Sequence, residues 1–295
     1  RYIEATSRLA ERFVEAYAQS GFRIPAIVSQ REVYARHVKP EISSMRTAYL
    51  IVDALRYEMA IELCAEIAGF DVRLRPALAV PPTITVVGMA ALMPRADKAF
   101  TLKEVGGRIG CQIEDVELRT RRDRMAYITE ATEVPTAICT LDQLLTLDDR
   151  RDSALAQAQL AVVTSQEIDE LCETGKSLLV NQMMRDMLHY LRQACHILNR
   201  LGYRRIVVTA DHGYLLVPEV GSGRKIDAPG GHTVELHRRC WVGKGGGAQP
   251  AVLRLPLADL GVDSSLELAV PRGLAVFKTR GSDTSYFHGG ITLQE

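Results

Sequence analysis

The segment from residue 160 to residue 211 constrains the fold most, because two apolar runs flank a long amphipathic pattern. LAVVTSQEID, residues 160–169, and RIVVTAD, residues 205–211, are typical of buried strands that end at a carboxylate. The pattern over 178–201 predicts one long helix, which Gly202 terminates. A strand, a long helix and a second strand form a βαβ unit, and this unit requires a parallel sheet.

Other segments extend this unit to a three-layer α/β fold with a mainly parallel sheet. Residues 48–52 predict a buried strand, and the pattern over 57–68 predicts an amphipathic helix that Gly69 terminates. Residues 71–80, DVRLRPALAV, alternate like a second strand, and residues 272–279, RGLAVFKT, predict a last one.

Composition along the chain suggests three parts. Residues 1–45 begin with a helical pattern and are expected to form a helical lead-in. Residues 46–94 and 159–295 carry the strand and helix patterns of the core. Residues 95–158 are more polar and are expected to form an inserted cap. A chain of 295 residues is long enough for one large α/β domain with such an insertion.

The overall composition excludes several classes of protein. Basic and acidic residues number 36 each, so net charge does not single out a nucleic-acid-binding protein, although a local basic patch would suffice. No apolar run reaches the roughly 18–20 residues that a membrane-spanning helix needs. Six scattered cysteines without C-x-x-C spacing indicate reduced core residues of a cytoplasmic protein. The chain lacks an initiator Met and a signal peptide, so we expect a domain of a longer protein; nothing indicates its oligomeric state.

Three strand-like runs end in a carboxylate, at Asp53, Asp169 and Asp211. In an open parallel sheet the ligand site lies at the carboxyl ends of the strands, so these side chains are expected to meet. Like charges that close repel unless a cation neutralises them. His212 and His288 would add nitrogen donors, and the mixed set suits zinc or manganese. A single Asp at a strand end is more often a cap or turn residue, so only the combination favours a metal site.

The chain also resembles a known family. LIVDALRYE, PPTITVVGMAALMP, VVTADHGYL and YFHGGITLQE occur in the order expected of a PglZ domain, a branch of the alkaline phosphatase superfamily. The motifs run from about residue 48 to 295. The resemblance implies an alkaline-phosphatase-like core and two divalent metal ions at the strand ends, with zinc preferred and manganese or magnesium as alternatives. It also implies a Ser or Thr that attacks phosphorus while it is coordinated to one metal.

The same resemblance assigns residues to the first metal. Asp53, Asp211 and His212 would hold it together with the nucleophile. Related phosphodiesterases have a P-T-x-T arrangement, which matches Thr85 as the attacking residue and leaves Thr83 as the alternative. Metal coordination lowers the pKa of a hydroxyl that is otherwise a poor nucleophile.

The second metal would take Asp169 and His288 by the same resemblance. Family members often have Asp-x-x-x-His here, whereas this chain has Glu173 at the position of the histidine. Either Glu173 replaces the imidazole as an oxygen ligand, or the second metal binds more weakly. An additional carboxylate would favour manganese or magnesium over zinc.

Basic segments provide candidate substrate contacts. Arg238 and Arg239 lie in a Gly-rich basic loop, which is either a solvated loop or a rim that contacts phosphate. RTRRDR, residues 119–124, is open to the same two interpretations. The preferred function is a metal-dependent phosphodiesterase that acts on nucleotides or nucleic acid. By resemblance it would belong to a phage-defence system of the BREX type, with other defence proteins as partners, or to a response regulator.

Two alternatives remain open at this point. The departure at Glu173 allows an interaction or scaffold module with little or no catalysis. A phosphomutase or a sulfatase-like enzyme would use the same scaffold. A sulfatase would need Cys or Ser in place of Thr85.

Overall fold

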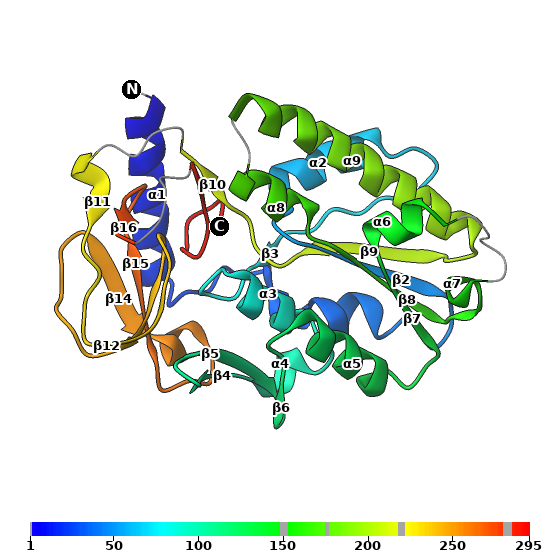
Figure 1. Ribbon diagram of the computed structural model, residues 1–295, viewed down its shortest axis with the longest axis horizontal. Coiled ribbons are helices and arrows are strands. Elements are labelled where there is room, and N and C mark those ends of the chain that lie inside the picture. Colours follow the sequence, from blue (N-terminus) through cyan, green and yellow to red (C-terminus); the bar gives the residue numbers. More distant parts are fainter. Residues whose placement is uncertain (1, 148–152, 175–176, 218–221, 280–284) are drawn as a thin grey trace.

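The computed structural model describes residues 2–147, 153–174, 177–217, 222–279 and 285–295. Its centre is a four-stranded sheet in the order β7-β8-β2-β9, in which every neighbouring pair is parallel (Figure 1). The strands are β7 (Thr136–Thr140), β8 (Leu160–Ser165), β2 (Thr47–Val52) and β9 (Arg205–Ala210). All six residues of β2 are buried, as expected of a central strand in a parallel sheet.

Helices cover both faces of this sheet (Figure 1). Successive side chains of a strand point to opposite faces, and those of β2 divide accordingly. Tyr49 and Ile51 join a hydrophobic cluster with α3 (Thr85–Ala91), α4 (Ala96–Ala99) and α5 (Arg121–Ala131). The alternate residues Ala48, Leu50 and Val52 join a second cluster with the helices of the other face. Those helices are α2 (Tyr57–Glu66), α6 (Leu141–Leu145) and α9 (Ser177–Arg200). The expected three-layer α/β/α architecture is confirmed.

The βαβ prediction is confirmed as well. The chain leaves β8, forms the short helix α8 (Glu167–Thr174) and then the long helix α9, and returns as β9. Gly202 follows α9 with a φ of 92°, a left-handed conformation in which glycine ends helices without strain. Strand β2 lies between β8 and β9 in register, with Val52 opposite both Ser165 and Ala210. The carboxyl ends of all three strands therefore lie level at one edge of the sheet.

A second, β-rich region lies beside the parallel sheet (Figure 1). Its main sheet is antiparallel, in the order β12-β13-β15-β14. The strands are β12 (His232–Leu236), β13 (Trp241–Lys244), β15 (Glu267–Pro271) and β14 (Val252–Pro256), with the helical turn η4 (Leu257–Leu260). Helix α1 (Tyr2–Gln19) lies in this part of the molecule (Figure 1).

Residues 95–158, expected as a cap, contain elements of two kinds. A three-stranded antiparallel sheet is formed by β4 (Phe100–Val105), β5 (Arg108–Ile113) and β6 (Val116–Glu117). Strand β7 and the short helix α7 (Ala154–Gln157) come from the same range, and β7 is the edge strand of the central sheet. The range thus contributes to the parallel sheet as well as to the hairpins beside it.

The remaining elements are short. Paired two-residue strands are β1 (Val28–Ser29) with β3 (Ala77–Leu78), β10 (Leu215–Leu216) with β17 (Tyr286–Phe287), and β11 (Lys225–Ile226) with β16 (Val276–Phe277). Helical turns are η1 (Gln30–Glu32), η2 (Tyr34–Val38) and η3 (Ser222–Arg224). Among the described helices, none combines the length and hydropathy that crossing a membrane requires.

The strand predicted over 71–80 is wrong except at Ala77–Leu78. The alternating apolar residues Val72 and Leu74 remain 39% and 38% exposed, because no layer of the fold covers this segment. Alternation predicts a strand only where a core is present to bury one face. The last predicted strand, 272–279, is likewise reduced to Val276–Phe277.

Candidate metal centre

Carboxylates gather at the edge of the sheet where the parallel strands end. Asp53 directly follows β2, and Asp211 directly follows β9. Asp169 lies in the first turn of α8, after β8. The backbone N–H of Asp53 donates a hydrogen bond of 2.8 Å to the carbonyl of Ser165, so the ends of β2 and β8 stay joined. The three acidic residues therefore meet because the parallel register brings their strand ends level.

The first cluster consists of Asp53, Asp211 and His212, whose ligand atoms all lie within 4.8 Å of one another. Asp211 Oδ1 accepts hydrogen bonds from the backbone N–H groups of Ala54 (2.9 Å) and His212 (2.8 Å). These bonds fix the carboxylate. Its other oxygen, Oδ2, lies 3.4 Å from His212 Nε2, and Asp53 Oδ1 lies 3.7 Å from the same nitrogen.

Two oxygens of this cluster are buried without a hydrogen-bond donor. Within the described part of the chain, neither Asp53 Oδ1 nor Asp211 Oδ2 has a partner. An unpaired buried carboxylate oxygen costs considerable free energy unless a cation or a proton compensates it. The two orphaned atoms are the ones that face His212 Nε2. This geometry fits a divalent cation between them.

The orientation of His212 supports the same conclusion. Its Nδ1 lies 2.9 Å from the carbonyl oxygen of Gly213. Because a carbonyl only accepts, Nδ1 must carry the proton, and Nε2 keeps its lone pair toward the carboxylates. A backbone acceptor on the far nitrogen is the usual way in which metal-ligating histidines are held. Burial lowers the pKa of His212 to about 4, so the ring is neutral at neutral pH.

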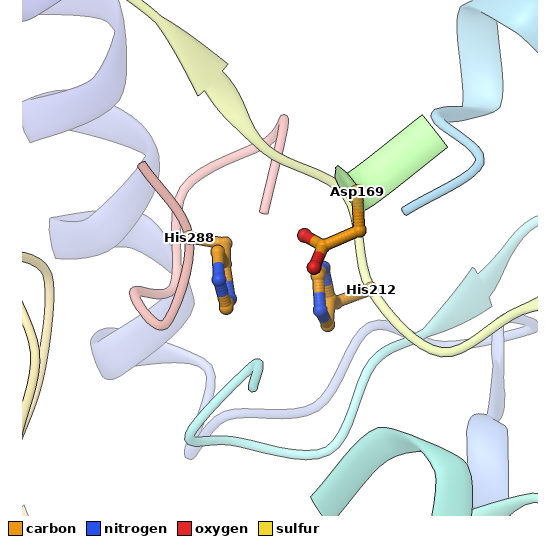
Figure 2. Close-up of side chains that lie close together, drawn as sticks. All are labelled: Asp169, His212 and His288. Carbon is orange, nitrogen blue, oxygen red and sulfur yellow. The ribbon is translucent and has the colours of Figure 1, made fainter. Parts of the chain in front are cut away.

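The second cluster consists of Asp169, His212 and His288, which Figure 2 shows arriving from three separate segments. His288 Nδ1 lies 3.2 Å from the carbonyl oxygen of Thr83, so its Nε2 is also left with a lone pair. Burial, together with the neighbouring His212, lowers the pKa of His288 to about 3. The hydroxyl of Tyr286 donates a 2.5 Å hydrogen bond to Asp169 Oδ1 and orients that carboxylate.

The carboxylates are strongly coupled. Burial and the charges of Asp211 and Asp169 raise the pKa of Asp53 to about 10. Burial also raises the pKa of Asp211 to about 7. Both carboxylates therefore resist ionisation side by side unless positive charge is present. Three carboxylates and two neutral imidazoles are a donor set for divalent ions, and this combination suits zinc or manganese.

Thr85 lies next to both clusters. It is the first residue of α3, and its Oγ1 lies 3.2 Å from His212 Nε2. Its half-buried side chain lines a cavity of about 380 Å³, together with Asp169 and His288. A hydroxyl at this position can be reached from the cavity and touches the ligand set.

Thr83, the alternative nucleophile, has a different environment. Its side chain is buried, and Oγ1 donates a 2.8 Å hydrogen bond to the carbonyl of Gly290. The same oxygen accepts a 3.2 Å hydrogen bond from the N–H of Gly289. These bonds hold the loop that carries His288, so Thr83 supports the site from behind.

Helix α3 reaches this position because Gly88 allows a close approach. A Cβ at Gly88 would lie 2.2 Å from the carbonyl oxygen of Asp211. Residues three apart on a helix share a face, so Gly88 and Thr85 face the end of β9 together. Gln30, which is buried, further ties this region together, because its Nε2 donates to the carbonyls of Ala210 and Asp211.

The arginines expected at the substrate lie elsewhere. Arg239 is 0% exposed, and its guanidinium donates to both carboxylate oxygens of Glu295 at 2.9 Å and to the carbonyl of Ala275. Burial and this ion pair give Arg239 a structural role. Arg238 lies over the ring of Phe287 at 5.9 Å and is not among the residues that line the cavity. The side chain of Glu173, on α8, lies outside the part of the chain that the structure describes.

The cavity has further lining residues, and only some of them were candidates from the sequence. The cavity is also lined by Ile84, Val86, Arg108, Ile109, Arg119, Glu235 and His237. Arg119 belongs to the RTRRDR segment, whereas nothing in the local sequence distinguishes Arg108. Tyr286 begins the short strand β17 and precedes His288 by two residues, so it is close to that residue in the sequence. That spacing was the available signal for Tyr286.

Comparison with known proteins places these features in a family. The sequence model described as "BREX system PglZ alkaline phosphatase-like domain" matches residues 33–295. The alkaline phosphatase-like protein BrxZ of Escherichia coli O9:H4 (strain HS) is 26% identical over 307 positions, covering 100% of this chain and 35% of BrxZ. The alkaline phosphatase-like protein PglZ of Bacillus cereus (strain H3081.97) is 24% identical over 295 positions, covering 96% of this chain and 33% of PglZ. The chain thus spans about a third of the length of these relatives.

Proposed function

The chain belongs to the family of BREX system PglZ alkaline phosphatase-like domains, and we propose that it is a metal-dependent phosphoesterase with Thr85 as its nucleophile. The observation that carries the proposal is the position of Thr85. Its Oγ1 lies 3.2 Å from His212 Nε2 and faces a cavity that Asp169 and His288 also line. No other hydroxyl among the described cavity-lining residues has these neighbours.

The donor set divides naturally between two divalent ions. Asp53, Asp211 and His212 would hold one, and Asp169 with His288 would hold the other. His212 belongs to both clusters, and Glu173 remains a further candidate for the second. When bound, such ions supply the positive charge that lowers the pKa of a hydroxyl and offsets the charge of a phosphoryl group.

The protein's own residues would orient the reaction. In the proposed step, Thr85 Oγ1 loses its proton to solvent and attacks phosphorus, the bond from phosphorus to the leaving ester oxygen breaks, and that oxygen leaves as an alcohol after taking a proton from solvent. Water then releases the phosphoryl group from Thr85. Gly88 keeps Thr85 against the end of β9, and Thr83 holds the loop of His288, so the reacting hydroxyl is fixed before substrate arrives.

We further propose that the substrate is a phosphodiester of a nucleotide or nucleic acid. The threonine in a P-T-x-T context supports a diester over a monoester, and the arginines that line the cavity suit a phosphate-containing substrate. We also propose a role in a BREX-type phage-defence system in the cytoplasm, with other defence proteins as partners; the mention of the BREX system in the family description supports the defence role. The chain covers only about a third of the length of its relatives. The activity of the complete protein is therefore also a proposal.

The proposal is tested by metal analysis of the purified protein and by hydrolysis of bis-p-nitrophenyl phosphate, a diester, and p-nitrophenyl phosphate, a monoester. We expect bound divalent metal and preferential cleavage of the diester, with both lost in Asp211→Ala. Activity that survives this substitution would place the reaction elsewhere. A folded protein without metal and without activity would favour an interaction module instead.

A further inference from the structure

Two arginines line the cavity from elements outside the parallel sheet. Arg108 begins β5, and Arg119 directly precedes Thr120, the N-cap of α5. Strand β5 packs against α3, and the thiol of Cys111 on β5 donates to the carbonyl of Val86 on α3 at 3.3 Å. The hairpin is thereby fixed beside Thr85. Both arginines thus line the cavity that the proposed nucleophile faces.

Among the described residues, these two guanidinium groups differ from those nearby in making no internal hydrogen bond, although the charge of Arg108 lies near enough to Glu235 to help lower the pKa of that carboxyl. Within the described part of the chain, neither Arg108 nor Arg119 donates a side-chain hydrogen bond or forms an ion pair, and both are exposed. By contrast, Arg121 Nε donates to Thr164 Oγ1 at 3.0 Å, and buried Arg124 donates to the carbonyl of Arg119 at 3.1 Å. Arg108 and Arg119 therefore keep their donors available to a ligand.

The rest of the cavity wall is suited to a nucleotide. Glu235 lies 3.2 Å from His237 Nε2, so this acidic side chain already has a partner within the wall. Ile84, Val86 and Ile109 supply apolar surface between the arginines and Thr85. A volume of about 380 Å³ lies at the low end of the roughly 300–1,000 Å³ typical of small-molecule sites. Such a cavity accepts one nucleotide of a strand, and it is too small for a duplex.

We propose that Arg108 and Arg119 bind a second phosphate of the substrate, next to the phosphate that Thr85 attacks. A guanidinium donates along a planar fork that matches two phosphate oxygens, which suits it to this task better than an ammonium. The inference rests on the proposed function, and it specifies the substrate as a single-stranded nucleotide chain with neighbouring phosphates. The two arginines then determine specificity, whereas the chemistry stays with Thr85.

The test uses equilibrium binding to the zinc-loaded Thr85→Ala protein, which removes turnover. The probes are the dinucleotide TpT, which has one phosphate, and TpT extended by a 5′- or a 3′-phosphate. An exposed ion pair is worth up to about fivefold in affinity, so we expect one extended probe to bind up to about twentyfold tighter than TpT. Arg108→Gln with Arg119→Gln should abolish that preference, and lysine at both positions should restore part of it. Arg122→Gln is the matched control, because Arg122 is exposed in the same segment but does not line the cavity.

Three outcomes would overturn the inference. The first is equal affinity for TpT and both extended probes. The second is an equal loss of affinity for all three probes in the double variant. The arginines would then bind the reacting phosphate itself, which every probe contains. The third requires thymidine diphosphate as an additional probe: an arginine-dependent preference for that probe alone would indicate a pyrophosphate site. Failure of the proposed function is distinguishable from these outcomes. In that case the protein with Thr85 intact would not cleave TpT, although the extended probe would still bind more tightly through the arginines.

Discussion

The imidazole rings of His212 and His288 stack face to face, with centroids 4.3 Å apart and planes 4° apart. Each ring is held through Nδ1 by a backbone carbonyl, of Gly213 and Thr83 respectively. Burial lowers the pKa of both rings and keeps them neutral at neutral pH. Two imidazolium ions stacked this closely would also repel each other. Neutral rings that are fixed in this manner are ready to bind metal, and the following predictions examine what depends on them.

Divalent metal should stabilise the protein through Asp53. At about 100 times its dissociation constant, a metal that binds only the folded state adds roughly 2.7 kcal/mol to the free energy of unfolding. Asp53→Asn should abolish this gain and stabilise the metal-free protein by about 1–2 kcal/mol, since Asp53, whose pKa burial raises to about 10, must take up a proton on folding at neutral pH, a cost that asparagine avoids. Urea unfolding with and without zinc measures both effects. Asp115→Asn, at an exposed carboxylate, is the control, and an undiminished zinc effect in Asp53→Asn would contradict the proposed ligand set.

The two threonines should separate chemistry from support. Thr85→Ala should lower kcat/KM for a diester by at least about 10³-fold while leaving stability nearly unchanged. Thr83→Ala should instead cost about 1–3 kcal/mol of unfolding free energy, because the N–H of Gly289 and the carbonyl of Gly290 lose their partner. Steady-state kinetics and urea unfolding of both variants decide between them. The reverse pattern would identify Thr83 as the nucleophile.

Tyr286 should position the second metal through Asp169. Tyr286→Phe removes the hydroxyl that donates to Asp169 Oδ1 but keeps the ring, which packs against Tyr214 with centroids 5.0 Å apart. Loss of such an orienting partner typically weakens metal binding about 10–100-fold. Calorimetric titration with zinc should show one weakened site and one unchanged site. Two unchanged sites would show that Asp169 is held without Tyr286.

Gly88 should be essential for both stability and activity. A methyl group at Gly88 would meet the carbonyl of Asp211, so Gly88→Ala must push α3 away from the end of β9. We expect the free energy of unfolding to fall by at least about 2 kcal/mol, because the helix is displaced. We also expect kcat to fall, since Thr85 moves with the helix. Gly247→Ala is the matched control, because a Cβ there meets nothing within 4 Å. Wild-type kinetics in Gly88→Ala would show that the close approach is dispensable.

The Arg239–Glu295 pair predicts a dependence of stability on pH. Burial alone would raise the pKa of Glu295, but Arg239 and hydrogen bonds outweigh it and hold this pKa below 4.5. The unfolded state then binds the proton more readily, so the stabilisation is complete above pH 4.5 and declines as the pH falls below it. Glu295→Gln should cost about 3–5 kcal/mol at pH 7, because Arg239 stays buried and charged.

Urea unfolding of both proteins from pH 8 to pH 4 checks this prediction. The difference between wild type and Glu295→Gln should stay constant down to about pH 5.5 and shrink below pH 4.5. Adding Arg239→Met to the variant should recover part of the loss. A difference that is independent of pH would mean that the charge of Glu295 contributes nothing.

The predictable parts of the fold are those that a pattern in neighbouring residues of the sequence indicates. Strand β2 and helix α9 follow from apolar periodicity, and Asp53 and Asp211 follow from their place directly after parallel strands. The buried position of Arg239 was not predictable, since its partner Glu295 lies 56 residues away and neither has a local signature. Arg108 enters the cavity only because a hairpin packs against α3. The clustering of Asp53, Asp169, Asp211, His212 and His288 matches the expectation from sequence, while their catalytic and ligand roles stay predictions.

The pairing of β10 with β17 has a consequence for biosynthesis. This pairing places His288 beside His212, so the site draws its residues from nearly the whole length between Asp53 and His288. A ribosome-bound chain that still lacks β17 has the sheet and Thr85 but only part of the ligand set. Synthesis itself therefore delays the assembly of the site, because the proposed ligand set is complete only after His288 has been added.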